Sequence, residues 1–307
     1  MDLSSINPVL LVASIMVSAT PILLAAIGEM VVERAGVLNL GVEGMMITGA
    51  VVGFAVAINT GNPALGFAAA ALASAVLSLS FGVLTQLLLS NQVATGLGLT
   101  LVGLGLSSLI GKPYEGMKSP TLQKLDLGVL SDLPVVGRML FSHDLMVYLS
   151  LALVVVVWAV LKYTRIGLIL RAVGENHDAA HALGYKVVRI RMMAIFFGGA
   201  CAGLGGAYLS LVRVPQWTEG MTAGAGWIAL AIVVFASWRA GRVAIGAYLF
   251  GGVTVLQLNL QAAGAAVPVA LLSASPYLMT ILVLVFISAR GAHGAPASLG
   301  RPFHASA

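Results

Sequence analysis

Charged residues are scarce in this sequence, and two long stretches contain none. Asp, Glu, Lys and Arg make up 9% of the 307 residues, whereas soluble domains carry roughly 25%. None of these four types occurs between residues 44 and 111 or between residues 243 and 289, and 59% of the chain is hydrophobic. These absences exclude a soluble globular protein and indicate a chain embedded in lipid.

Several other features are also missing. The chain has one cysteine, Cys201, which excludes a disulfide within the chain. No segments alternate between apolar and polar positions, which excludes a membrane β-barrel. The first apolar segment has no positively charged leader, so we expect no cleavable signal peptide. Gly111-Lys112 is followed by Pro113 rather than Ser or Thr, so the phosphate-binding loop of ATPases is absent.

The apolar stretches predict about nine membrane-spanning helices, within a range of about eight to ten. Each crossing needs about 20 mostly apolar residues. We therefore expect an all-α polytopic membrane protein with one transmembrane domain over residues 1–290. The tail over 291–307 is mainly Ala, Gly, Pro and Ser, and we expect it to be disordered. The expected spans are 8–28, 41–58, 63–90, 94–111, 144–162, 191–212, 223–238, 242–260 and 267–288.

Lys and Arg are distributed unevenly between the two sides. When the polar segment over residues 162–191 is placed in the cytoplasm, eleven of the sixteen basic residues fall on that side. Four of the other five lie in the loop over 112–143, and the fifth is Arg213. Because basic residues concentrate in cytoplasmic loops, we expect a cytoplasmic C-terminus and, with nine spans, an external N-terminus. The net charge of +5 thus reflects topology, and no nucleic-acid partner is expected.

The polar segment over residues 162–191 predicts a short surface helix. Asn176 is suited to cap its start, Asp178 favours the helix dipole in the first turn, and Gly184 suits its end. A thin capped helix can enter a groove on another protein, but an ordinary cytoplasmic loop explains the spacing equally well. The helix is thin because it is rich in alanine: Ala179, Ala180 and Ala182.

Polar residues inside spans are costly in lipid and are therefore candidates for a transport pathway. Asn39 and Glu43 lie among the glycines of residues 36–44. Broken helices at membrane depth are tolerated where they are buried in protein or line a cavity. We expect residues 36–44 to form such a break, facing the pathway or a partner subunit. The alternative is a cytoplasmic loop with a solvated Glu43.

Asn91, Gln92 and Trp227 are further pathway candidates, because they open the fourth and seventh spans. Amides and an aromatic ring suit a sugar or nucleobase ring through hydrogen bonding and stacking. A belt of aromatic side chains at the membrane interface is the alternative for Trp227 and the favoured interpretation for Trp217.

Two pairs of residues lie four apart, a spacing that could indicate a metal site or a pair of interacting carboxylates, but simpler interpretations exist. His177 and His181 share one helix face, but no third ligand accompanies them, and we expect no metal site. Glu29 and Glu33 could be paired carboxylates. Because Arg34 is adjacent and the first span is expected to end near residue 28, a charged cytoplasmic turn is the simpler interpretation.

Several segments resemble one family of membrane proteins. Asp178-Ala-Ala-x-x-x-Gly184 resembles the EAA-x-x-x-G signature of the cytoplasmic coupling loop in bacterial ABC-importer permeases, with Asp where Glu is favoured. Residues 29–45, 91–100 and 226–230 are similar to permeases of the branched-chain amino acid and simple-sugar superfamily, nearest the nucleoside-uptake branch. The resemblance covers about residues 20 to 252.

This resemblance implies a permease subunit of an ABC importer in the bacterial cytoplasmic membrane. It would move nucleosides or related simple sugars inward by alternating access. Its implied partners are a separate ATPase that uses ATP and Mg²⁺, a second homologous permease and an extracytoplasmic substrate-binding lipoprotein; the chain itself would bind no cofactor. The coupling loop over residues 163–190 would dock the ATPase through Glu175, Asn176, Asp178, Ala179, Ala180 and Gly184.

Two other functional classes compete with this interpretation. The main alternative is an ion-coupled secondary transporter of a small polar solute, with Glu43 as the coupling carboxylate; it would work without ATP or partners. A membrane-embedded enzyme would need converging catalytic residues. The polar residues expected at membrane depth form no such set: Asn39, Glu43, Gln86 and Gln257.

Overall fold

The computed structural model describes residues 8–125, 128, 133, 135–263, 268–289 and 294–304. Within these residues every regular element is helical, and seven helices are long and apolar enough to cross a membrane. These seven are α1 (Pro8–Arg34), α2 (Val42–Thr60), α3 (Pro63–Gly82), α4 (Gln92–Gly111), α6 (Leu145–Tyr163), α9 (Val187–Tyr208) and α11 (Ala240–Ala262).

The remaining elements are two further apolar helices, two π-helical turns and four short helices. The apolar helices α10 (Ala225–Phe235) and α12 (Val269–Ala289) coincide with the seventh and ninth predicted spans. Two π-helical turns, η2 (Val83–Leu87) and η5 (Leu209–Arg213), extend α3 and α9. The other helices are η3 (Lys112–Tyr114), α5 (Val136–Leu140), α7 (Arg165–Glu175) and α8 (His177–Ala182). All nine predicted spans therefore coincide with helices, and the all-α polytopic fold is confirmed.

Local sequence signals set several helix starts. The Asn62 side chain accepts a hydrogen bond from the Ala64 N–H at 2.9 Å, and Asn91 accepts one from the Ala94 N–H at 3.0 Å. Asp144 caps α6 in the same way, at 2.9 Å from the Met146 nitrogen. These side chains satisfy backbone donors that have no partner within the helix.

The prediction that the first span ends near residue 28 is wrong, because α1 continues to Arg34. Glu29 and Glu33 are consequently buried inside the protein rather than exposed in a cytoplasmic turn. Trp238 donates its indole N–H to Glu33, and the Arg34 guanidinium donates to the Trp238 carbonyl oxygen at 2.8 and 3.0 Å. These contacts give the charged end of α1 partners within the protein, so the helix does not need to stop where charge begins.

Helix α9 packs against α1, α2 and α3 through small residues. A β-carbon added at Gly206 would lie 1.8 Å from the Met46 carbonyl oxygen, and one at Gly49 would lie 2.5 Å from Gly203. Only glycine permits such close backbone contact. In lipid, where apolar burial does not drive helices together, close contact of this kind holds them together.

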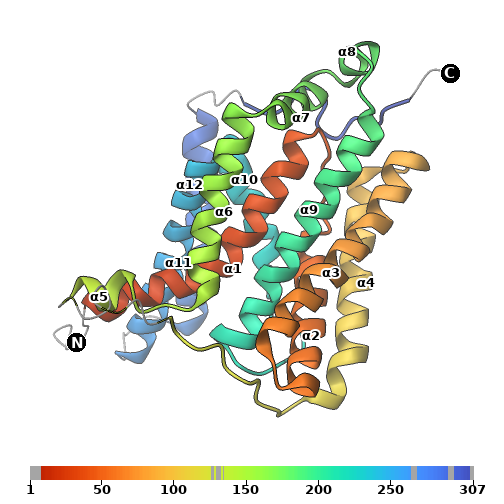
Figure 1. Cartoon of the computed structure of the whole chain (residues 1–307). Helices are drawn as coiled ribbons and strands as arrows, with labels where there is room; N and C mark the ends of the chain where they lie inside the picture. Colours follow the sequence, from red (N-terminus) through yellow and green to blue (C-terminus); the bar gives the residue numbers. More distant parts are fainter. Residues whose placement is uncertain are drawn as a thin grey trace.

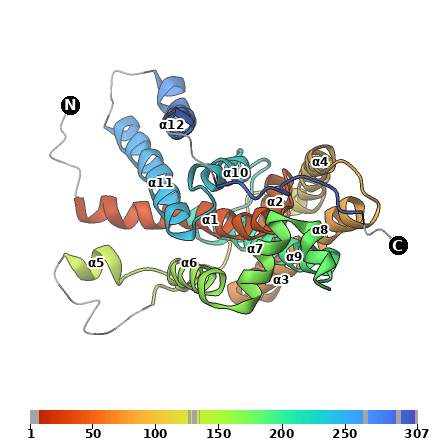
Figure 2. The ribbon, with the colours of Figure 1, turned by 90° about the horizontal axis from the view of Figure 1, so that it is seen from above.

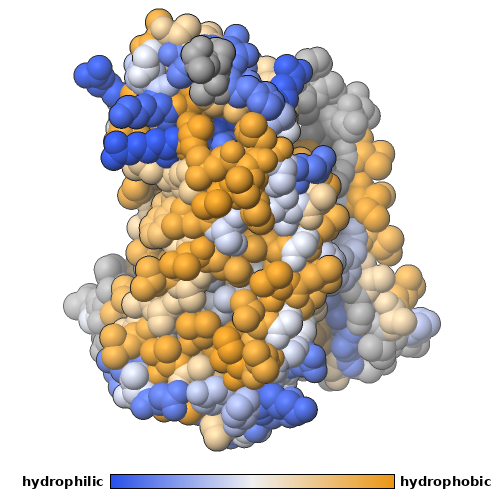
Figure 3. All heavy atoms as spheres, turned by 90° about the vertical axis from the view of Figure 1, so that its right-hand side faces the viewer, coloured by the Kyte–Doolittle hydropathy of each residue, from blue (hydrophilic) through white to orange (hydrophobic). Residues whose placement is uncertain are grey.

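The outer surface has the pattern of a membrane protein. Figure 3 shows a broad apolar band between polar surfaces at the two ends of the molecule. Leu101 and Leu109 on α4 are 71% and 75% exposed, as side chains in contact with lipid would be. Trp217, assigned to the interfacial belt from its position in the sequence, is instead buried, and its indole N–H donates to the Ser107 hydroxyl at 3.2 Å.

Figure 1 places α7 and α8 at one end of the bundle and the start of α1, with α5, at the other. The view from above shows α11 and α12 set apart from α2, α3 and α4, with α1 running between the two groups (Figure 2). The described tail, residues 294–304, lies at the α8 end (Figure 1). The segment around α8 and the region around the start of α1 therefore lie at opposite ends of the bundle.

Candidate functional site

The first region is the short helix α8. The Asn176 side chain accepts a hydrogen bond from the Ala179 N–H at 2.9 Å, and Gly184 ends the segment with a φ of +87°. The helix expected between these residues is therefore present. Most residues expected to contact an ATPase are exposed: Glu175, Asn176, Asp178, Ala179 and Gly184.

The opposite face of α8 is buried in the protein itself. Ala180, expected to contact an ATPase, is only 2% exposed and packs in a small cluster with Val173, Val187 and Phe303. The sequence pattern did not separate the two faces, because six residues are too few for a periodic signal. The pattern also did not identify Leu183 as a contact residue, although this side chain lies beside the helix and is 76% exposed.

Arg191 connects α8 to three other segments. Its side chain is fully buried and donates hydrogen bonds to the Ala35 carbonyl at 3.2 Å, to Gln86 Oε1 at 3.2 Å and to the Arg301 carbonyl at 3.1 Å. A further contact, of 3.0 Å, joins it to Nδ1 of His177. In the sequence, Arg191 contributed only to the count of basic residues on the cytoplasmic side. Its position at the start of a span was the sole indication that it could link several segments.

His177 lies on the buried side of α8, outside the membrane-spanning helices. Burial lowers its pKa below the usual value, and the Arg191 charge lowers it further, while Asp178 acts in the opposite direction. Arg191 has only donors to offer, so Nδ1 of a neutral His177 is the acceptor in their contact. The neutral imidazole therefore fits this arrangement and the protonated form does not.

The tail expected to be disordered is in fact packed against α7 and α8 over residues 294–304. The Ser298 N–H donates to the Gly174 carbonyl at 2.9 Å, and the Ser298 hydroxyl accepts from the His177 N–H at 3.3 Å. Phe303 is buried, with its ring centroid 5.4 Å from that of His177 and 5.2 Å from that of His181. Hydrogen bonds to Ser298, Gly300 and Arg301 together with the buried ring of Phe303 hold the tail in place.

The residues between α1 and α2 have no helical structure over 37–39, and α2 begins beside the middle of α4. A β-carbon added at Gly44 would lie 2.6 Å from the Leu99 carbonyl oxygen, and Leu99 is near the centre of α4. The start of α2 is thus deep within the bundle, where a break had been expected.

Glu43 is buried at this position and is not solvated. Its carboxylate accepts hydrogen bonds from the Thr222 hydroxyl at 2.6 Å, the Gly224 N–H at 2.9 Å and the Gly226 N–H at 2.7 Å. Gly224 and Gly226 lie at the N-terminus of α10, where a negative charge is favourable. Glu43 therefore joins the start of α2 to the start of α10.

The other pathway candidates lie in several places. Asn39 accepts a hydrogen bond from the Gly41 N–H at 2.8 Å, and Gln92 accepts one from the Leu38 N–H at 2.8 Å. Both side chains thus hold the segment between α1 and α2, while Asn91 caps α4. Trp227 is half-exposed at the start of α10.

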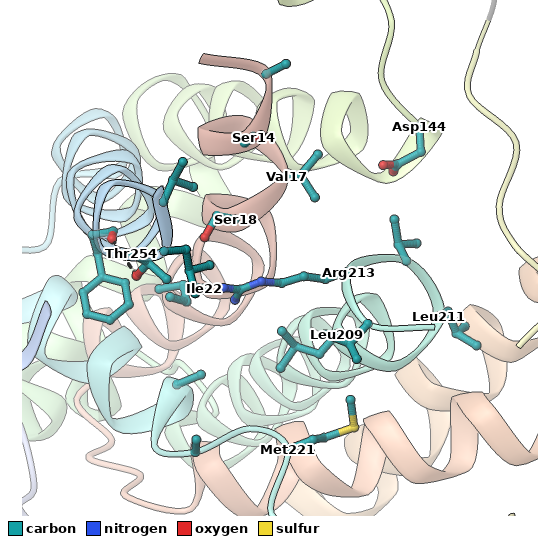
Figure 4. A pocket seen from close by; sticks show the side chains of 18 of the residues that line it. Ser14, Val17, Ser18, Ile22, Asp144, Leu209, Leu211, Arg213, Met221 and Thr254 are labelled. Carbon is teal, nitrogen blue, oxygen red and sulfur yellow. Dashed lines mark hydrogen bonds between the residues drawn. The ribbon is translucent and has the colours of Figure 1, made fainter. Parts of the chain in front are cut away.

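The second region is a cavity of about 1230 Å³ at the end of the bundle where α1 begins. Its walls come from α1, η5, α10, α11 and α12, and from residues within 121–124, 142–144 and 214–223. Figure 4 shows the side chains of Ser18, Arg213 and Thr254 among those that line it. None of the five pathway candidates lies among the lining residues that the structure describes, but Glu43 reaches the wall through Thr222.

Within the described ranges, no three His, Cys, Asp or Glu side chains are arranged to hold a metal ion. His177 and His181 both contact the ring of Phe303. The arrangement of these two histidines is thus that of an aromatic cluster.

Comparison with known proteins identifies a family that covers most of the chain. Residues 11–287 match the family described as branched-chain amino acid transport system / permease component. The putative glucose ABC transporter permease protein TsgC13 of Haloferax volcanii is 41% identical over 88% of each chain. The guanosine ABC transporter permease protein NupQ of Bacillus subtilis is 31% identical over 99% of this chain and 98% of its own. The nucleoside ABC transporter permease protein NupC of Lactococcus lactis is 30% identical over 90% and 91%.

A second permease from each of two of these organisms also matches the chain. The glucose permease protein TsgB13 of Haloferax volcanii is 26% identical over 89% of this chain and 74% of its own. The guanosine permease protein NupP of Bacillus subtilis is 25% identical over 78% and 72%. No solved structure matches the chain significantly.

Proposed function

This chain belongs to the family of branched-chain amino acid transport system permease components, and from that premise we propose that it is the permease subunit of an ABC importer for nucleosides or related simple sugars. The observation that carries the proposal is an exposed, thin α8 on a multi-pass membrane protein that lacks a phosphate-binding loop. The solute class is supported by relatives that are named as guanosine, nucleoside and glucose permeases.

In this proposal α8 docks into a groove on a separate ATPase that binds ATP and Mg²⁺. Asp178 and Ala179 face outward and would contact the ATPase directly, while Ala180 supports the helix from below. Arg191 would pass movement of α8 to the carbonyl of Ala35, where the segment leading to α2 begins. ATP-driven movement of α8 would thereby shift the bundle between its two access states.

The proposed orientation places α8 and the tail in the cytoplasm and the start of α1, with the cavity, outside. A binding lipoprotein on the outer face would then deliver solute to the cavity. We infer a second, homologous permease because two different permeases from each of Haloferax volcanii and Bacillus subtilis match this chain. The transporter would reside in the cytoplasmic membrane.

The test is uptake of radiolabelled guanosine and glucose by cells that express the chain with its companion permease, ATPase and binding protein. We expect uptake of one of these solutes, and we expect it to be lost when the ATPase carries an inactivating change in its phosphate-binding loop. Uptake that persists with that ATPase variant and follows a proton or sodium gradient would contradict the proposal.

A further inference from the structure

Ser18, on α1, lies in the cavity wall with a buried hydroxyl group that is not used within the protein. Its side chain is 4% exposed, and its oxygen has no hydrogen-bond partner among the residues that the structure describes. The nearby Thr20 hydroxyl, in contrast, donates to the Met16 carbonyl at 2.8 Å. Buried polar groups in proteins are almost always hydrogen-bonded, so an unpaired one at a cavity wall points to a partner that comes and goes.

Arg213 presents an unused cation to the same cavity. It lies at the end of η5, and Figure 4 shows its side chain extending across the cavity toward Ser18 and Ile22 on α1. No described residue forms a hydrogen bond or an ion pair with its guanidinium. The π-helical turn that places Arg213 is closed by the Val214 N–H donating to the Leu209 carbonyl at 2.9 Å, and turns of this type occur frequently at functional sites.

The one carboxylate among the described lining residues, that of Asp144, is held by other donors and forms no hydrogen bond or ion pair with Arg213. Asp144 Oδ1 accepts hydrogen bonds from the Met146 and Val147 N–H groups at 2.9 and 3.2 Å. Its Oδ2 accepts from the Tyr208 hydroxyl at 2.8 Å. The donors of the Arg213 guanidinium therefore remain available to an oxygen atom of a molecule that enters the cavity.

The surroundings of Ser18 and Arg213 are largely apolar. Val17, Ile22 and Leu209 line the cavity around them (Figure 4). A few directed polar groups on an apolar wall are the usual composition of a small-molecule site. Donors from Arg213 and a hydroxyl from Ser18 suit the hydroxyl or carbonyl oxygens of an uncharged ring, whose flat or apolar faces would contact the walls.

We propose that Arg213 and Ser18 bind the transported solute inside this cavity, through the hydroxyl or carbonyl oxygens of an uncharged sugar or nucleoside ring. The assignment rests on the proposed transport function and adds the position of a solute site to it. Binding here would precede passage of the solute toward the α8 end of the bundle.

The experiment uses a cysteine reporter in the complete transporter in membrane vesicles. Replacing Cys201 with alanine removes the only thiol of this chain, the partner subunits are used in cysteine-free form, and Thr254→Cys then places a reactive thiol on the cavity wall. The rate of modification by a small methanethiosulfonate reagent is measured with increasing guanosine or glucose. We expect one of these solutes to slow the modification, and Arg213→Gln to raise the half-protecting concentration about 10-fold or more.

Matched variants separate solute binding from general damage. Ser18→Ala should raise the half-protecting concentration by a few-fold, because it removes one hydrogen bond. Lys112→Gln, which removes an exposed cation outside the cavity, should leave protection unchanged. Modification of the Arg213→Gln reporter without solute should proceed at the original rate, which shows that the cavity is intact.

Three outcomes would overturn the inference. One is ATP-dependent uptake of guanosine or glucose without any protection of the reporter. Another is protection that Arg213→Gln does not weaken. The third is stronger protection by inorganic phosphate or guanosine monophosphate than by the uncharged solutes, which would make the site an anion site. Absence of ATP-dependent uptake in the unmodified transporter would instead contradict the proposed function.

Discussion

Two buried charges, Glu43 and Arg191, are stabilised in different ways at the scale of single residues. Glu43 accepts hydrogen bonds from three donors and faces the N-terminus of α10. Arg191 has no carboxylate partner within the described residues and donates to carbonyl and side-chain acceptors from separate segments. The first arrangement joins the start of α2 to the start of α10, and the second links α9 to four separate segments.

Replacing Glu43 with glutamine should destabilise the protein. The amide nitrogen of the introduced side chain cannot accept the hydrogen bonds that one carboxylate oxygen now accepts, and a buried donor would lose its partner. We expect a loss of about 2 kcal/mol, measured by thermal unfolding of the purified protein in detergent. Glu115→Gln, at an exposed position, serves as the control. Unchanged stability with lost uptake would point to a pathway role for Glu43 instead.

Replacing Arg191 with methionine should separate ATP hydrolysis from transport. The variant retains an apolar stem of similar length but cannot bond to His177 and Ala35. We expect solute-dependent uptake to fall about 10-fold or more while the assembled transporter still hydrolyses ATP. Arg189→Met removes an exposed charge two residues away and should have little effect. Equal loss of uptake in both variants would argue against a specific link through Arg191.

At the scale of elements, the helices could be predicted and the cavity could not. Hydropathy located the spans because seven of the helices are each long and apolar by themselves, whereas α10 is apolar but has only 11 residues. Helix ends were less accurate where charged residues are buried, as at Glu33, whose partner Trp238 is 205 residues away. The cavity brings together Ser18, Arg213 and Thr254 from three distant segments. The only sequence signal among them was Arg213, the one basic residue of the outer set that lies outside the loop over 112–143.

The contact between α8 and the tail should weaken as the pH falls. The pKa of His177 is lowered in the folded protein, so the neutral form stabilises the contact. This stabilisation is complete above the ordinary histidine pKa of about 6.5 and is lost as the pH falls toward the lower folded value. Protection of the amides of residues 298–303, measured as their exchange rate relative to the intrinsic rate at the same pH, should therefore fall below about pH 6.5. In His177→Asn this protection should not depend on pH in this range, and an unaltered pH dependence would show that another group titrates.

At the scale of the whole molecule, the two candidate regions lie at opposite ends of one bundle. The cavity is at the end where α1 begins, whereas α8 and the tail are at the other end (Figure 1). In the proposed orientation, with α8 in the cytoplasm, the cavity lies toward the outside. This structure would then represent the state that accepts a solute from a binding protein.

Thiol labelling can test this orientation directly. The only native cysteine, Cys201, is buried and should not react. A cysteine at Leu183, beside α8, should react with a membrane-impermeant reagent in inverted vesicles and not in intact cells. A cysteine at exposed Lys118, in the loop after η3, should show the reverse. The opposite labelling pattern would place α8 outside the cell and remove the basis for ATPase docking.

The glycine contacts of α9 limit which helices can move relative to one another. Gly206 touches the backbone of α2 at Met46, and Gly203 touches α3 at Ala70, so sliding any of the three would make backbone atoms collide. Within α1, Pro21 lacks the N–H that would bond to the Val17 carbonyl and so forms a natural flexing point. We infer that α2, α3 and α9 move as one rigid unit, and that α1 is held to it at Pro21, where Gly205 of α9 makes the same kind of close contact.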